Sequence, residues 1–82
     1  MNIVVIERDN RIRNKDARDR IIGGSPSASF ESARVLVFAH REWGNEIFPS
    51  WVDNGTNYDE VNSETGEVVK QYFVRAIAIP EI

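Results

Sequence analysis

The strongest constraint on the fold of this chain is the stretch from Val68 to Ile79, which places apolar side chains on both faces of an extended chain: Val69, Phe73, Ile77 and Ile79 on one face, and Val68, Tyr72, Val74, Ala76 and Ala78 on the other. A period of two is the geometry of an extended strand, whose successive side chains point to opposite faces of a sheet. Twelve residues make a long strand, so we expect it to bend or to hold a β-bulge before Pro80 ends it.

The apolar composition also favours strands. The chain has nine isoleucines and nine valines but only one leucine, and branching at Cβ suits a pleated sheet better than a helix. Further strands are predicted at 2–7, 47–52 and 58–62. The unbroken apolar run at 2–7 is typical of a central strand covered on both faces, whereas Pro49 restricts 47–52 to an edge or a bulge.

One helix is predicted over residues 30–43. Ser29 is a good N-cap, Glu31 places a carboxylate in the first turn, and Gly44 is a candidate for the C′ position. The run at 35–38 would also suit a strand, and the capping residues decide for the helix.

The segment from 8 to 27 is predicted to be a variable loop, because dense mixed charge leads into Gly23-Gly24-Ser25-Pro26-Ser27. An alternative is a short second strand at 11–13. Gly66 is expected to close a hairpin turn in the left-handed conformation. The 82 residues therefore predict one small α+β domain (1–82), with a single helix packed on a mainly antiparallel sheet of four to five strands.

The sequence offers little catalytic chemistry. There is no cysteine and only one histidine, which excludes disulfides, thiolate metal sites and an all-histidine site. We interpret His40 as a partly buried structural residue. Asp59, Glu60 and Glu64 lack the spacing of a calcium loop, and the glycines at 23–24 lack the lysine of a phosphate loop. We therefore expect no enzyme activity, no catalytic residue, no metal and no cofactor.

The net charge of −3 conceals an uneven distribution. Residues 51–67 hold five acidic side chains and no basic one, and two aromatic residues flank the turn at 54–55. Tyrosine and tryptophan are frequent interface anchors, and carboxylates around them would suit a basic groove on a partner. The alternative is that both aromatic residues cap the core of the sheet. The predicted partner-binding residues are Trp51, Asp53, Tyr58, Asp59, Glu60, Glu64 and Glu67.

An N-terminal strand followed by Ser29-Phe30-Glu31-Ser32-Ala33-Arg34 at the start of a helix, in a short acidic chain without cysteine, resembles the small anti-defence proteins of phages and mobile elements, including anti-CRISPR inhibitors. The likeness extends over the architecture of the whole chain. It implies steric occlusion, in which acidic side chains occupy Lys and Arg positions that otherwise contact phosphates.

The partner implied is a host protein or ribonucleoprotein complex with a basic groove, with no direct nucleic-acid contact by this chain. The N-terminal apolar run is too short for a signal peptide or a membrane span. We therefore expect a cytoplasmic protein of a bacterial host, as a monomer or homodimer.

The alternative hypothesis is a small nucleic-acid-binding regulator that uses the arginine-rich segment (residues 8–20). Its candidate phosphate contacts are Arg8, Arg11, Arg13, Lys15, Arg18 and Arg20. Four acidic residues lie at 7–19, within or beside this segment, and they weaken the field that it could present to a phosphate backbone.

Overall fold

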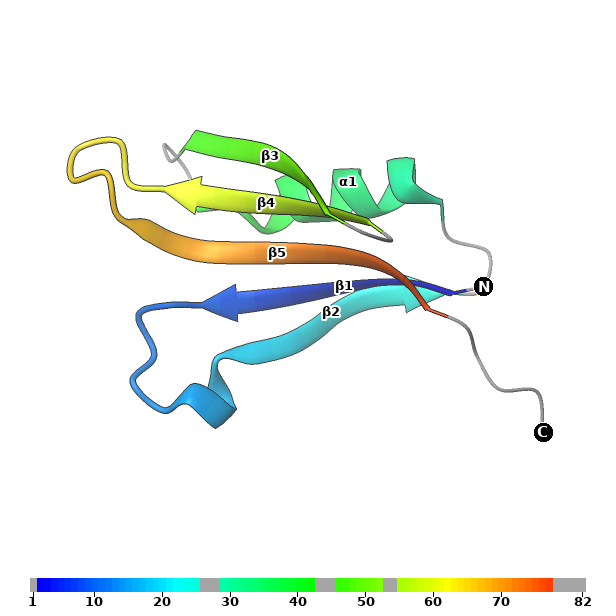
Figure 1. Ribbon diagram of the computed structural model, residues 1–82, viewed down its shortest axis with the longest axis horizontal. Helices are drawn as coiled ribbons and strands as arrows, with labels where there is room; N and C mark the ends of the chain where they lie inside the picture. Colours follow the sequence, from blue (N-terminus) through cyan, green and yellow to red (C-terminus); the bar gives the residue numbers. More distant parts are fainter. Residues whose placement is uncertain (1, 26–28, 43–45, 53–54, 78–82) are drawn as a thin grey trace.

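The described residues form one five-stranded sheet and one α-helix (Figure 1). The computed structural model describes residues 2–25, 29–42, 46–52 and 55–77. In chain order the elements are β1 (Asn2–Asp9), the short 3-10 helix η1 (Lys15–Ala17), β2 (Asp19–Ser25), α1 (Phe30–His40), β3 (Glu46–Val52), β4 (Gly55–Val61) and β5 (Val68–Ile77). The strand order in space is β2-β1-β5-β4-β3, and every neighbouring pair is antiparallel. The predicted α+β fold is confirmed.

The long strand β5 is the middle of the sheet, with β1 on one side and β4 on the other. Its pairing with β4 is irregular, as the sequence predicted. Glu60 pairs with Lys70 and Val61 pairs with Val68, which leaves Val69 as an extra residue on β5. Gly66 closes the β4–β5 turn with φ of 76°, so its predicted left-handed conformation is also confirmed.

Strand β2 corrects the prediction of a loop over 8–27. Residues 19–25 pair with β1, and the alternative strand at 11–13 lies instead in the connection between the two strands. The glycines suggested a break, but one of them serves helix packing. A Cβ placed on Gly23 would lie 2.2 Å from Leu36 Cδ2, so a side chain at this position would push α1 away from the sheet.

Helix α1 begins where the capping residues predicted. The Ser29 hydroxyl accepts a hydrogen bond from the Ser32 backbone N–H (3.2 Å), and the Ser32 hydroxyl accepts one from the Ser29 N–H (3.0 Å). The helix ends at His40, three residues earlier than predicted, because Arg41 is extended with φ of −63° and ψ of 151°. Gly44, the predicted C′ residue, lies outside the described residues. Within the described residues, no helix is long and apolar enough to cross a membrane.

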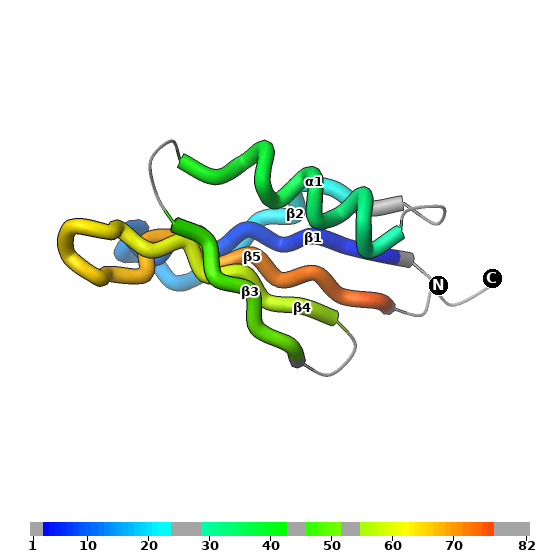
Figure 2. The backbone as a smooth tube through the Cα atoms, turned by 90° about the horizontal axis from the view of Figure 1, so that it is seen from above, coloured from blue at the N-terminus to red at the C-terminus, as the bar shows by residue number. Residues whose placement is uncertain are grey.

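The core lies between α1 and one face of the sheet (Figure 2). Its buried members are Ile3, Val5, Ala33, Val37, Tyr58, Tyr72 and Val74. The opposite face, the open face of the sheet, has no helix over it among the described residues. Val4 and Ile6 of β1 are only half-buried there, so the prediction that 2–7 is covered on both faces is wrong. The apolar run reflects the interior place of β1 in the sheet, since a single helix covers one face only.

Strand β3 is an edge strand, as Pro49 predicted. It begins beside the C-terminal end of α1 and runs away from the helix towards Val52 (Figure 2). Helix α1 packs against β1, β5 and β2. At the far end of β3, the face of the sheet that looks towards the helix is therefore not covered by it.

Candidate functional site

The acidic residues predicted to form one binding face are divided by the fold. Asp59 and Glu60 are consecutive on β4, so their side chains point to opposite faces. Glu60 is fully buried on the helix side, and its Oε1 accepts a hydrogen bond from the Glu42 backbone N–H (2.8 Å). Asp59 is half-buried on the open face, where its Oδ1 accepts one from Gln71 Nε2 (3.2 Å). The prediction that Glu60 is a surface charge is wrong, because strand alternation turns it inward.

The other predicted carboxylates lie at the far end of the β4–β5 hairpin. Glu64 and Glu67 are exposed in and after the turn, and neither forms an ion pair with another described residue. Asp53 lies outside the described residues. Two exposed carboxylates at a turn do not make the continuous acidic surface that the sequence suggested.

The two predicted aromatic anchors have different environments. Tyr58 is 7% exposed and belongs to the core, where its ring meets Phe38 edge-on with centroids 5.8 Å apart. The prediction of Tyr58 as a surface anchor is therefore corrected, because it faces the helix from the middle of β4. Trp51 is 85% exposed at the far end of β3. It remains available as an anchor.

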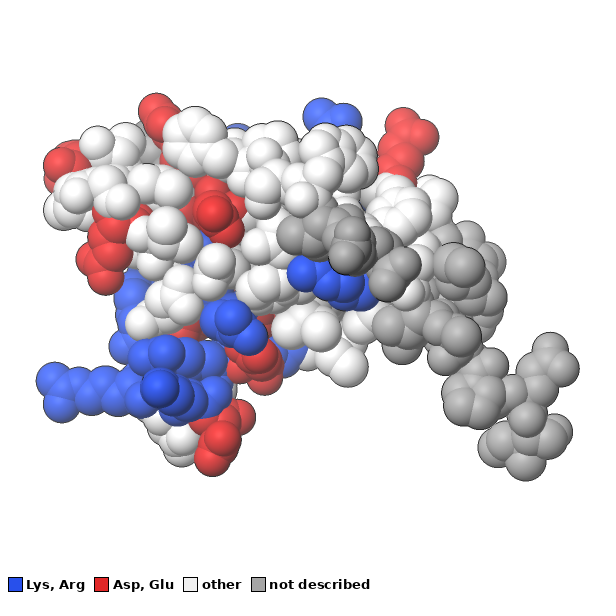
Figure 3. Space-filling model, in the orientation of Figure 1, with Lys and Arg blue, Asp and Glu red and all other residues white. Residues whose placement is uncertain are grey.

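The arginine-rich segment satisfies much of its charge internally. Four of its six cations have partners: Arg8 with Asp19 (2.7 Å), Arg11 with Asp9 (3.0 Å) and Glu42, Arg18 with the Ile12 carbonyl (2.5 Å), and Arg20 with Glu7 (2.9 Å). Arg13 and Lys15 are exposed and pair with no carboxylate in the described part of the chain. Lys and Arg gather at this end of the molecule (Figure 3), with carboxylates among them.

These pairs perturb the acids that they hold. The hydrogen bond from Arg8 lowers the pKa of Asp19, and the hydrogen bonds from Arg11 lower the pKa of Asp9. Both carboxylates are therefore ionised well into the acidic range. Their charge offsets the arginines, so the segment organises the β1–β2 connection more than it presents free cations to a phosphate backbone.

A buried polar cluster beneath the C-terminal end of α1 was not predicted. Glu7 is 4% exposed; its Oε1 pairs with Arg20, while its Oε2 accepts no hydrogen bond within the described structure and lies 3.9 Å from Lys70 Nζ. The Tyr72 hydroxyl donates to the His40 carbonyl (3.0 Å). Burial raises the pKa of Tyr72, and Glu60 and Glu7 raise it further. Tyr72 therefore stays a neutral donor that ties the helix end to the sheet.

This cluster has a structural role. Among the described residues, no group of three or more His, Asp and Glu side chains could hold a metal ion. His40 contributes its backbone carbonyl to the cluster, in keeping with a structural role. Nothing in the sequence pointed to the burial of Glu7, because it follows the apolar run of β1 as if it ended the strand.

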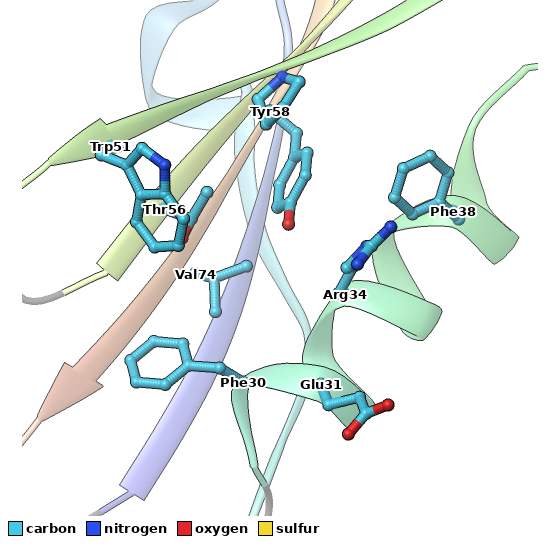
Figure 4. Close-up of a pocket in the computed structure, with 9 residues that line it drawn as sticks. Phe30, Glu31, Arg34, Phe38, Trp51, Thr56, Tyr58 and Val74 are labelled. Carbon is cyan, nitrogen blue, oxygen red and sulfur yellow. The ribbon is translucent and has the colours of Figure 1, made fainter.

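A concave surface lies between α1 and the β3–β4 hairpin, and we call it the aromatic groove (Figure 4). Its volume is about 480 Å³. Its lining residues are Phe30, Glu31, Arg34, Phe38, Pro49, Trp51, Thr56, Tyr58 and Val74. Six of these nine are apolar or aromatic, one is a threonine and two are charged residues of α1, so the groove offers an apolar floor with charge only on the helix side.

Two sequence periodicities create the aromatic groove. On α1, Phe30, Arg34 and Phe38 recur every four residues and line the wall nearest β3. On β3, Pro49 and Trp51 are two residues apart and share the face that looks towards the helix. Phe30 is 45% exposed in this wall.

Comparisons with known proteins add no family: the chain matches no protein-family model, no curated protein and no solved structure.

Proposed function

We propose that this protein is a non-enzymatic protein-binding module that holds its partner in the aromatic groove. The observation that carries the proposal is Trp51, a tryptophan with 85% of its surface exposed at the mouth of an apolar groove. Large exposed aromatic residues beside a concave apolar surface are typical of interaction sites, because their burial against a partner is favourable.

Neighbouring residues extend this apolar surface. Phe30 on α1 is 45% exposed, and Pro49 on β3 shares the groove-facing side of its strand with Trp51. A partner that covered Trp51 and Phe30 together would bury two large aromatic side chains. Each fully buried aromatic side chain contributes about 1.5–3 kcal/mol.

Strand β3 engages the partner through its side chains in this proposal. Pro49 has no backbone N–H and lies in the middle of the edge strand. An added strand would lack one donor at that point, which is a common device against pairing between sheet edges. The groove-facing side of β3 is therefore a better contact surface for a partner than the backbone edge of the strand.

The resemblance to small anti-defence inhibitors supplies the biological proposal: the module blocks a nucleic-acid-handling host complex by covering its surface. Inhibition through an acidic face that imitates phosphates is less well supported than inhibition through the groove, because Glu60 is buried and Asp59 faces the opposite side of the sheet. The nucleic-acid-binding alternative is weaker too, since Arg8, Arg11 and Arg20 are paired with carboxylates.

The proposal is tested by affinity capture from host extract with three versions of the protein. The parent chain and an Ile21→Ala control should capture the same partner, because Ile21 is 71% exposed but lies on the opposite edge strand. Trp51→Ala should lose that partner. Retention of the partner by Trp51→Ala would contradict the proposal, and salt-sensitive binding to bare DNA or RNA would favour the nucleic-acid alternative.

A further inference from the structure

We infer that the segment bound in the aromatic groove is an acidic one, with a carboxylate next to a large apolar side chain. This inference rests on the proposed function and names the chemistry of the partner. It also reverses the charge expected from the sequence, which suggested acidic residues here and a basic groove on the partner.

Two arginines contact Phe38, a lining residue of the groove: Arg34 lines the groove itself, and Arg41 follows the end of α1. The Arg34 guanidinium lies 5.6 Å from the centroid of the Phe38 ring, and the Arg41 guanidinium lies 5.7 Å from the same centroid. Both side chains are exposed. Neither forms an ion pair with any carboxylate in the described part of the chain.

These arginines differ from those at the other end of the molecule. Arg8, Arg11 and Arg20 each have a carboxylate within 3.0 Å, so their charge is already compensated. Arg34 and Arg41 have only an aromatic ring as their described partner. A guanidinium stacked on a ring keeps its N–H groups free in the ring plane, where they can hold a carboxylate by two parallel hydrogen bonds.

The remaining polar groups of the groove favour the same ligand. In Figure 4 the Tyr58 hydroxyl projects into the space between α1 and the sheet, the Arg34 guanidinium lies beside the helix near Phe38 at the wall of that space, and the Glu31 carboxylate points away from the sheet. The β3 wall contributes Pro49 and Trp51, which carry no charge. An apolar side chain can therefore lie against Trp51, Val74 and Phe30 while a neighbouring carboxylate meets Arg34.

A basic segment would fit less well. It would place a cation near Arg34 and Arg41, and like charges at an interface oppose binding; Glu31, the one acidic residue among the described lining residues, points away from the sheet. The apolar floor alone would bind either segment, so the arginines decide between them.

The test uses two fluorescein-labelled peptides of equal length. One alternates Leu and Phe with Asp and Glu, and the other has Lys at every acidic position. Fluorescence anisotropy measures their affinity for the full chain. We expect the acidic peptide to bind at least about tenfold more tightly at about 50 mM salt, with a smaller difference at about 500 mM salt because screening weakens the charge term.

Variants locate the effect. Arg34→Glu should weaken the acidic peptide about tenfold, and Arg34→Lys should keep part of the preference because it keeps the charge. Arg13→Glu is the matched control, because it makes the same charge change at an exposed, unpaired arginine away from the groove. It should alter the affinity for the acidic peptide less than about twofold, since only the long-range electrostatic field changes. Circular dichroism verifies that each variant is folded.

Each outcome has one meaning for the inference. Equal or tighter binding of the lysine peptide, equal effects of Arg34→Glu and Arg13→Glu, or no binding of either peptide would overturn it. If the lysine peptide binds and Trp51→Ala abolishes that binding, the inference fails while the proposed groove function stands. If the acidic peptide binds equally well to Trp51→Ala, the groove function itself fails.

Discussion

Tyr72 and Phe73 are consecutive residues on β5, yet they lie in opposite environments. Tyr72 is fully buried between the sheet and α1. Phe73 is half-buried on the open face, where the guanidinium groups of Arg8 and Arg75 lie 4.7 and 5.2 Å from its ring centroid. One face is covered by a helix, and the other is covered in part by the chain's own arginines.

The same contrast explains the aromatic groove. Trp51 and Tyr58 are both on the helix side of the sheet, but α1 covers only part of that side. A helix is about 10 Å wide, while five strands spaced by about 4.8 Å extend over roughly twice that width. The helix buries the residues beneath it and leaves the far strand uncovered. Only residues on the helix side of the sheet can be buried under α1. The width of the helix determines which of these residues it covers.

The largest expected effect tests the two faces directly. Tyr72→Ala should lower the free energy of unfolding by about 3–5 kcal/mol, because it removes a fully buried ring, leaves a cavity and breaks the hydrogen bond to the His40 carbonyl. Phe73→Ala should cost only about 1–2 kcal/mol. Urea denaturation measures both, and equal losses would mean that the two faces do not differ in energy.

A second comparison uses the neighbours Glu60 and Asp59. Glu60→Lys should destabilise the fold by about 3 kcal/mol, because it places a cation in a fully buried site and removes the acceptor for the Glu42 N–H. Asp59→Lys should stay within about 0.5 kcal/mol, as most surface changes do. Thermal unfolding of both variants decides this, and a tolerated Glu60→Lys would disprove the burial of that carboxylate.

The helix that separates the two environments can be weakened at its start. Ser29→Ala removes the N-cap acceptor and should cost about 0.5–2 kcal/mol. Ser50→Ala, an exposed serine on β3, should have almost no effect. Chemical denaturation compares the two, and an equal response would mean that the cap contributes nothing to the covered face.

The exposed ion pairs predict a weak dependence of stability on pH. Their arginine partners lower the pKa of Asp19 and Asp9 in the folded state. This stabilisation is complete above the ordinary carboxyl pKa of about 3.9, and it is lost as the pH falls through the lower folded-state values. Exposed pairs contribute less than about 1 kcal/mol each.

The measurement is unfolding by urea between about pH 2 and pH 5. Asp19→Asn should reduce the acid-dependent loss of stability, since it removes one of the two titrating groups. An unchanged pH profile for this variant would show that the Arg8–Asp19 pair makes no net contribution.

The smallest expected effect on stability belongs to Trp51. Because its side chain is 85% exposed, Trp51→Ala should change the free energy of unfolding by no more than about 0.5 kcal/mol while it abolishes partner binding. Parallel unfolding and capture experiments test this separation. A large loss of stability in Trp51→Ala would mean that Trp51 packs in the core and is not part of the binding surface.

Local features of this protein followed from its sequence alone. The start of α1 at Ser29, the edge position imposed by Pro49, the left-handed Gly66 and the irregular long strand each depend on a few neighbouring residues. The cap at Ser29, the missing N–H of Pro49 and the positive φ of Gly66 involve only a few consecutive residues each. A local sequence pattern is therefore sufficient to predict them.

Only the tertiary structure decided which side chains are buried and which meet. Glu60 and Tyr58 were predicted to bind a partner because one belongs to an acidic run and the other flanks a polar turn, but their face of β4 turns towards α1. Gly23 was predicted in a loop, but it pairs with Val5 in the sheet and lies against Leu36 of the distant helix. The aromatic groove exists because one helix covers less than the width of five strands, and a sequence does not state how far a helix reaches across a sheet.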